Sequence, residues 1–122
     1  MNMSTFLSNN VYNETDTDHQ VDAYTLHVFK VPIKNDNSWQ RHIDTILECA
    51  NNACADYVAP ATVFFNNMAS KRQVDPPLVE PRVNIKVNTP AEIFLLVRVS
   101  IPIKLRGTIE QQIIKDYLSK IH

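Results

Sequence analysis

Two apolar segments joined by a short Asn-Thr-Pro turn are the feature that most constrains the fold. In the first, residues 79–87, Val83, Ile85 and Val87 alternate with polar residues, which is typical of a strand with one buried face. The second, residues 92–105, is rich in β-branched residues and apolar on both faces in its first half. The short turn predicts an antiparallel hairpin, and its buried face requires a covering layer of helices.

Two other stretches have the helical period that could supply this layer. Apolar residues recur every three or four positions, which predicts a buried stripe on each helix. The first stripe consists of Trp39, Ile43, Ile46, Leu47, Ala50, Ala53, Cys54 and Tyr57, and the second of Ile109, Ile113, Ile114, Tyr117, Leu118 and Ile121. Pro60 breaks or restarts the first helix, a second helical piece reaches about Ser70, and Asp75-Pro76-Pro77 ends it.

Residues 23–34 complete the pattern with a strand in which Pro32 indicates an edge or a strand end. The predicted order is β-α-β-β-α, an α+β, ferredoxin-like arrangement with an antiparallel sheet and the helices on one face. Such a fold closes with a fourth strand, which the pattern does not predict here, so we expect an open sheet edge. The predicted core consists of Ile43, Leu47, Val83, Ile85, Val87, Ile93, Leu95, Ile113 and Leu118.

The chain of 122 residues has the size of one domain, predicted to span residues 22–122. Residues 1–21 are polar and acidic and are expected to form a flexible N-terminal segment. Thr5-Phe6-Leu7 is the only local apolar cluster there. Four acidic residues precede the first basic residue, Lys30: Glu14, Asp16, Asp18 and Asp22.

Charge and hydropathy argue against several classes of function. The net charge of −1 and the scattered Lys and Arg residues do not favour a nucleic-acid partner. No apolar run approaches the ~20 residues of a membrane span, and no signal peptide is visible. We therefore expect a soluble, cytoplasmic chain.

No catalytic, cofactor-binding or metal-binding residues are predicted. Gly107 is the only glycine, whereas phosphate-binding loops need several. The four histidines lack metal-ligand spacing; His42 is expected to face solvent on its helix, and His27 to be exposed on its strand. Asp44 and Glu48 lie on one helix face, where paired acids are more often solvated than catalytic.

The two cysteines, Cys49 and Cys54, are five residues apart in a helical stretch, so their side chains diverge. Free, buried thiols are the expected state.

Several short segments, in order, resemble one family. Val31-Pro32-Ile33, a polar turn and Ser38-Trp39-Gln40-Arg41 are similar to the strand-turn-helix opening of the C-terminal soluble domain of small-conductance mechanosensitive ion channels. Val79-Glu80-Pro81-Arg82-Val83, the run Ile93 to Val99 with Arg98, and the helix Ile109 to Ile121 are similar to its later elements. The similarity covers about residues 24–121.

The resemblance implies a non-catalytic assembly domain. In that family, seven copies wall a cytoplasmic vestibule below the pore, so the chain would be a homo-oligomer attached to the membrane only through transmembrane segments of a parent protein. The isolated chain could not conduct ions. Two alternatives remain open: a free-standing ferredoxin-like module that binds a ligand or partner, and an enzyme of acylphosphatase or monooxygenase type, although the loop after residue 33, KNDNSWQ, lacks the glycines of such a phosphate-binding loop.

The missing ligand spacings and the single glycine predict that the purified chain binds neither metal nor nucleotide. Isothermal titration calorimetry with zinc and with ATP should give no heat of binding. Micromolar affinity for either compound would contradict this prediction.

Overall fold

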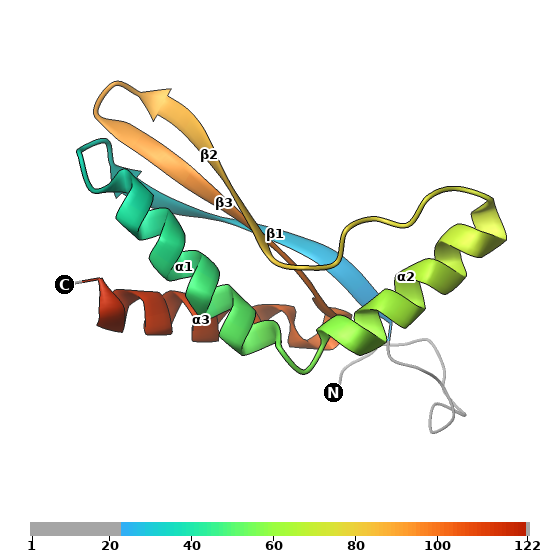
Figure 1. Ribbon diagram of the computed structural model, residues 1–122. Coiled ribbons are helices and arrows are strands. Elements are labelled where there is room, and N and C mark those ends of the chain that lie inside the picture. Colours follow the sequence, from blue (N-terminus) through green and yellow to red (C-terminus); the bar gives the residue numbers. More distant parts are fainter. Residues whose placement is uncertain (1–22, 122) are drawn as a thin grey trace, which may run out of the picture.

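The computed structural model describes residues 23–121, and its arrangement is shown in Figure 1. The expectation of a flexible segment at residues 1–21 lies outside the described residues. The elements in chain order are β1 (Tyr24–Lys34), α1 (Trp39–Cys54), α2 (Val58–Arg72), β2 (Arg82–Thr89), β3 (Glu92–Pro102), a short 3-10 turn (Ile103–Leu105) and α3 (Arg106–Lys120).

The three strands form an antiparallel sheet in the order β1-β3-β2, so β3 lies in the centre and the other two strands are edges. The β1–β3 ladder runs from the pair Tyr24–Pro102 to the pair Lys34–Glu92 without a register shift. Both edge strands are antiparallel to β3 and hence parallel to each other. This confirms the predicted hairpin and the α+β class, with a long helical connection between β1 and β2.

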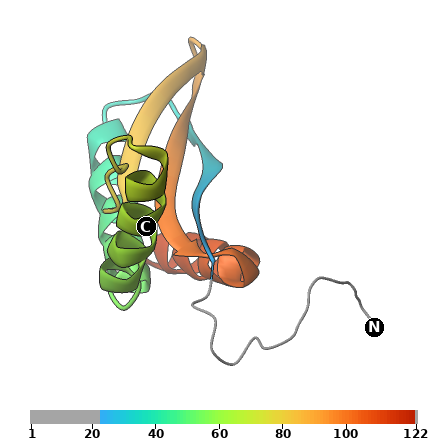
Figure 2. The same ribbon diagram turned by 90° about the vertical axis from the view of Figure 1, so that its right-hand side faces the viewer.

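The main core lies between one face of the sheet and helices α1 and α3 (Figures 1 and 2). Odd-numbered residues of β3 face these helices, and each is at most 2% exposed: Ile93, Leu95, Val97, Val99 and Ile101. Ile46 of α1 and Ile113 of α3 are fully buried against them. The prediction of helices on one face is therefore correct for α1 and α3.

The order β-α-β-β-α is incomplete, because α2 is a separate helix that extends away from α1 and α3 (Figure 1). The chain turns at residues 55–57, before Pro60. Pro60 lies in the first turn of α2, where its missing N–H costs no helical hydrogen bond. Helix α2 packs in a second, smaller cluster around Tyr24, Ala61 and Val79. Tyr24 is an even-numbered residue of β1, so its side chain points away from the α1–α3 face.

Prolines also set the strand bounds that the sequence pattern placed wrongly. β2 begins at Arg82, not at residue 79, because Pro81 directly precedes it and Val79 packs in the α2 cluster. β3 ends at Pro102, where the chain enters the 3-10 turn, although the pattern predicted a strand to residue 105.

Three predicted core residues are exposed in the structure: Ile85 (43%), Val87 (67%) and Leu118 (55%). Ile85 and Val87 are paired with Leu95 and Ile93, so they lie on the correct face of the sheet. They are exposed because β2 is an edge that the helices cover only in part. Ile43 and Val83 are partly buried and pack against the core. Leu47 is also partly buried.

Neighbouring residues of α1 provide a test of this core. Ile46→Ala should reduce the free energy of unfolding by about 2–5 kcal/mol, because Ile46 is fully buried. Leu47→Ala should cost clearly less, because Leu47 is only half-buried and the site stays open to solvent. Urea titrations of both variants measure the difference. Equal losses would show that α1 is rotated relative to the sheet.

Candidate functional site

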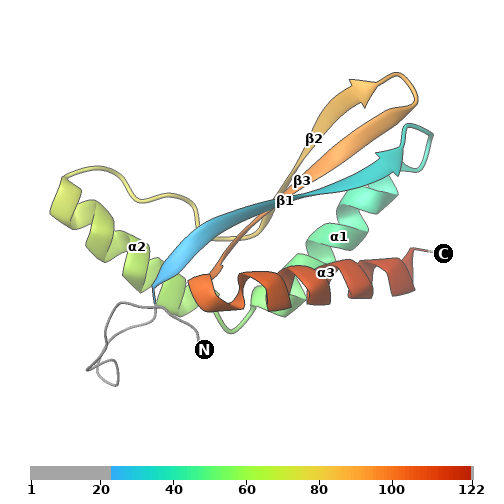
Figure 3. The same ribbon diagram turned by 180° about the vertical axis from the view of Figure 1, so that it is seen from behind.

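An apolar groove of about 430 Å³ opens between β1 and α3. Figure 3 shows that β1 and α3 diverge towards the end of β1, and the groove lies between them. Its floor and walls are mainly aliphatic, with Val31 and Ile33 from the strand and Ile114, Leu118 and Ile121 from the helix. This is the position, next to β1, that the fourth strand occupies in a ferredoxin-like sheet.

The outward backbone groups of β1 face the groove and have no partner strand within residues 23–121. The Asn35 N–H donates to the Ala91 carbonyl (3.1 Å), and the Ile103 N–H donates to the Ala23 carbonyl (3.0 Å), which extends the β1–β3 ladder at both ends. Both bonds fall on odd-numbered residues of this register. Because bonding alternates along an antiparallel pair, even-numbered residues of β1 point their N–H and C=O groups to the open edge.

Pro32 is one of these even-numbered residues, so this edge lacks one donor. The prediction that Pro32 marks an edge or a strand end is confirmed for the edge, because β1 has no second partner strand within residues 23–121.

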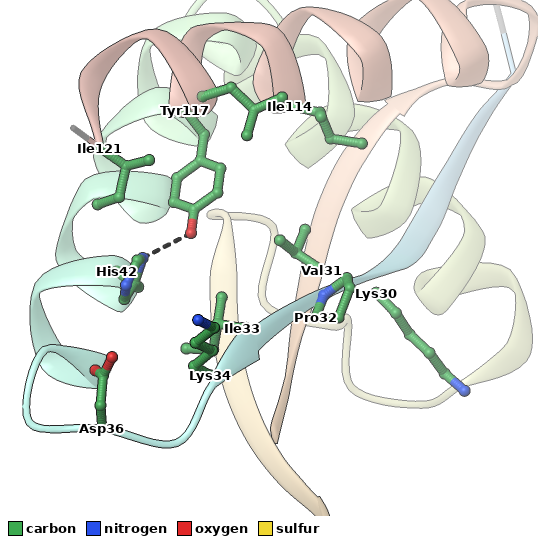
Figure 4. A pocket seen from close by; sticks show the side chains of 11 residues that line it. Lys30, Val31, Pro32, Ile33, Lys34, Asp36, His42, Ile114, Tyr117 and Ile121 are labelled. Atoms are coloured by element: carbon green, nitrogen blue, oxygen red, sulfur yellow. Dashed lines mark hydrogen bonds between the residues drawn. The ribbon is translucent and has the colours of Figure 1, made fainter. Parts of the chain in front are cut away.

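Helix α3 presents two different faces. Ile109, Ile113 and Tyr117 pack into the main core, whereas Leu118 is 55% exposed at the groove. An aliphatic side chain of this size at a helix surface is ordinary by itself, but here it continues the wall of the groove. Ile114 and Ile121 belong to the same wall (Figure 4). Leu118 is exposed because no fourth strand covers it among the described residues.

Polar groups lie at the rim of the groove. Lys30 and Lys34 extend from β1, and the Lys30 ammonium lies 5.5 Å from the centre of the Phe94 ring on the other face of the sheet. Asp36 accepts hydrogen bonds from the Ser38 hydroxyl (2.6 Å) and the Ser38 N–H (2.8 Å), which lower the pKa of its carboxyl group. The rim thus includes two lysines and one aspartate.

His42 and Tyr117 close the inner end of the groove. The Nδ1 atom of His42 lies 2.7 Å from the Tyr117 hydroxyl (Figure 4). His42 is half-buried, so the expectation that it faces solvent is wrong: Tyr117 packs over it from α3. Burial raises the pKa of the Tyr117 hydroxyl, which keeps it protonated over the ordinary pH range.

The other residues considered from the sequence lie apart from the groove. His27 is half-buried, not exposed, and its Nε2 atom lies 2.7 Å from Glu110 of α3, because odd-numbered residues of β1 face the helices. Asp44 and Glu48 are both exposed, as expected, and Asp44 accepts a hydrogen bond from Gln40. Trp39 begins α1 and is 40% exposed.

The resemblance had included Arg98, which donates to the Leu78 carbonyl. No group of three metal-ligating residues occurs within residues 23–121.

Sequence reasoning did not single out Lys30, Lys34, Ile114 or Ile121 for a site. The available signal was a pattern that predicts only three strands, combined with a helix stripe too wide for one sheet face. What the groove can do chemically is bind an extended chain through backbone hydrogen bonds and aliphatic contacts.

Comparisons with protein-family models, with curated proteins and with solved structures gave no match to this chain. The similarity to mechanosensitive channels therefore stays a prediction from the sequence. In the part of the chain that the structure describes, no helix is long and apolar enough to cross a membrane.

Both cysteines are free and buried, as expected. Desolvation raises the pKa of the Cys49 and Cys54 thiols to about 11, and the neighbouring Asp116 adds to the effect at Cys49. Because the thiolate is the reactive form, these cysteines should be inert in the folded chain.

The raised thiol pKa values predict a loss of stability at alkaline pH. The unfolded chain releases the thiol protons near pH 9, whereas the folded chain holds them up to about pH 11. The free energy of unfolding should therefore be constant below this range and fall as the pH rises through it.

Urea titrations between these pH values measure the effect, with the Cys49→Ala/Cys54→Ala double variant as control. The fall should be smaller in the double variant, with a remainder from Tyr117. An identical fall in both proteins would exclude the thiols as its cause.

Proposed function

We propose that this chain is a non-catalytic assembly domain that associates with copies of itself through the open edge of β2. The observation that carries the proposal is this edge, where seven of eight residues are exposed and Ile85 and Val87 are uncovered. Exposed apolar side chains beside unpaired backbone groups are typical of an interface.

The backbone of β2 is suited to pairing with a second copy. Even-numbered residues of β3 face β2, and they are paired with Arg82, Asn84 and Lys86. The odd-numbered residues of β2 therefore direct their N–H and C=O groups outwards. No proline interrupts β2, so every outward position has a donor.

Side-chain pairing also supports a symmetric contact at this edge. Two β2 strands related by a two-fold axis at Ile85 would place Ile85 opposite its copy and Val83 opposite Val87. On the other face, Asn84 would lie opposite Lys86. No two like charges oppose each other in this register.

The edge of β1 is less suited to the same contact. A two-fold axis at Pro32 would place Lys30 directly opposite Lys34 of the copy. Neither copy of Pro32 would have a backbone N–H to donate. Lysine and proline are the residues by which edge strands avoid self-pairing.

Helix α2 supplies a second apolar surface. Val63, Val74 and Leu78 are each 58% exposed on this helix and the segment after it. Because α2 extends away from the main core, it can reach a different face of a neighbouring copy (Figure 1). Such heterologous contacts build rings, whereas the β2 edge alone builds dimers.

In the wider role that the sequence resemblance implies, copies of this domain wall a vestibule on the cytoplasmic side of the membrane, and ion transport belongs to a parent channel. This role rests on the resemblance alone. The genomic reading frame upstream of Met1 tests it: membrane helices encoded in frame with this domain would support a channel, and an unrelated upstream gene would contradict it.

A free-standing binding module is the second candidate, and the β1–α3 groove favours it. A volume of about 430 Å³ with aliphatic walls and two lysines at the rim is within the range of small-ligand sites. Self-association would not be needed for this function.

Substitutions at the β2 edge test self-association. Sedimentation from about 10 to 500 μM should show mass increasing with concentration in the unmodified chain. Ile85→Lys places two lysines opposite each other at the proposed two-fold axis and should raise the dissociation constant about tenfold or more. Val87→Lys, at the more exposed position, should act in the same direction.

Val28→Lys is the matched control, because Val28 is also an exposed aliphatic residue on an edge strand, but on β1. It should leave association unchanged, with circular dichroism confirming that all variants are folded. A strictly monomeric unmodified chain over the whole range would refute self-association of this domain.

A further inference from the structure

We propose that the face of the sheet that points away from α1 and α3 (Figure 1) binds single-stranded nucleic acid. Basic side chains of the strands hold the phosphates, and the ring of Phe94 stacks against a base. The net charge of the whole chain does not favour such a partner, but the fold distributes that charge unevenly. The inference is independent of self-association, which uses the edge of β2.

The three strands place all their Lys and Arg side chains on this face. Even-numbered residues of β1 and β3 point away from the main core, and the β2 residues paired with them share their direction. The basic residues at these positions are Lys30, Lys34, Arg82, Lys86 and Arg98. Glu92 is the only acidic residue in β1, β2 and β3. Surfaces of soluble domains usually mix both signs of charge, so this excess is typical of a site for an anionic partner.

The positive excess is confined to the sheet. Outside the strands, residues 23–121 carry seven Lys and Arg against eight Asp and Glu. The register places Arg82 directly opposite Arg98, although they belong to different strands of the hairpin. Like charges in directly opposed positions destabilise a sheet. A phosphate bound between these two residues would replace their repulsion by attraction.

An open apolar strip lies between the basic residues of the two edges. Phe94 and Leu96 of the central strand are half-buried, whereas their neighbours on β1 and β2 are exposed. Helix α2 and the segment after it cover only the end of this face near the start of β1, where the Leu78 carbonyl accepts a hydrogen bond from Arg98. The end towards the β2–β3 turn is open within residues 23–121.

The aromatic ring favours nucleic acid over other anions. The Lys30 ammonium lies over the Phe94 ring, 5.5 Å from its centre. A stacked base gains more at an aromatic ring than an exposed lysine does, so it can displace Lys30, which then reaches a phosphate. Acidic side chains offer no flat ring to Phe94. A membrane surface requires apolar side chains that protrude, whereas those of Phe94 and Leu96 are half-buried. A single strand fits better than a duplex, whose bases are stacked on one another.

Fluorescence anisotropy of the full chain with labelled oligothymidylate and oligouridylate tests the proposal and distinguishes DNA from RNA. At least one of them should bind at about 50 mM salt, and the logarithm of the affinity should fall with the logarithm of the salt concentration with a slope of about −2 to −3, as expected for three or four phosphate contacts. The double variant Lys30→Glu/Lys86→Glu should raise the dissociation constant about tenfold or more, because it reverses one charge on each edge. Phe94→Leu keeps an apolar side chain in the half-buried position and should raise it about fivefold or more, through loss of one stacked base.

The double variant Arg106→Glu/Lys115→Glu is the matched control. It makes the same charge change at two exposed positions of α3, on the other side of the sheet, and should leave the affinity nearly unchanged. Circular dichroism checks that all variants are folded. Lack of binding to both oligonucleotides would overturn the proposal, and so would equal losses in the two double variants. Unchanged binding by Phe94→Leu, or equally strong competition by oligoglutamate or phosphatidylserine vesicles, would contradict it as well, since the face would then select for negative charge alone.

Discussion

The pairing of β3 with both of its neighbours is the interaction on which the rest of the structure depends. β3 is bonded to β1 on one side and β2 on the other, and its helix-facing side chains are almost completely buried. Helices α1 and α3 are held together by contacts with these side chains and with each other. Without the central strand, neither edge strand has a partner and neither helix has a sheet face to pack against.

A sheet of three strands has two edges, and in this chain the two edges differ in chemistry. The edge of β1 carries lysines and a proline beside an aliphatic groove. The edge of β2 has uninterrupted donors and exposed Ile85 and Val87. The two edges therefore differ both in side-chain charge and in the continuity of their backbone donors.

The ionisable groups within the core serve structure. The cysteine thiols of α1 are held neutral by burial, with Asp116 of α3 beside Cys49, and the Tyr117 hydroxyl is paired with His42. His27 and Glu110 join β1 to the first turns of α3. Each of these contacts connects a helix to a strand or to the other helix, so they stabilise the relative placement of the elements.

Local periodicity in the sequence determined the hairpin, the two core helices and the α+β class, because alternation and helical stripes depend only on which residues are near in the chain. It also indicated that Pro32 lies at an edge or a strand end. Tertiary structure alone decided the exposure of Ile85, Val87 and Leu118: they have the right pattern for a core, but burial requires a covering element, and a pattern does not show whether one is present. The same reason explains why His27 and His42 are half-buried although exposed positions were expected. Their partners, Glu110 and Tyr117, lie 83 and 75 residues away in sequence. The groove could not be predicted from the sequence either, because it is formed by the first strand and the last helix, which meet only when the chain folds.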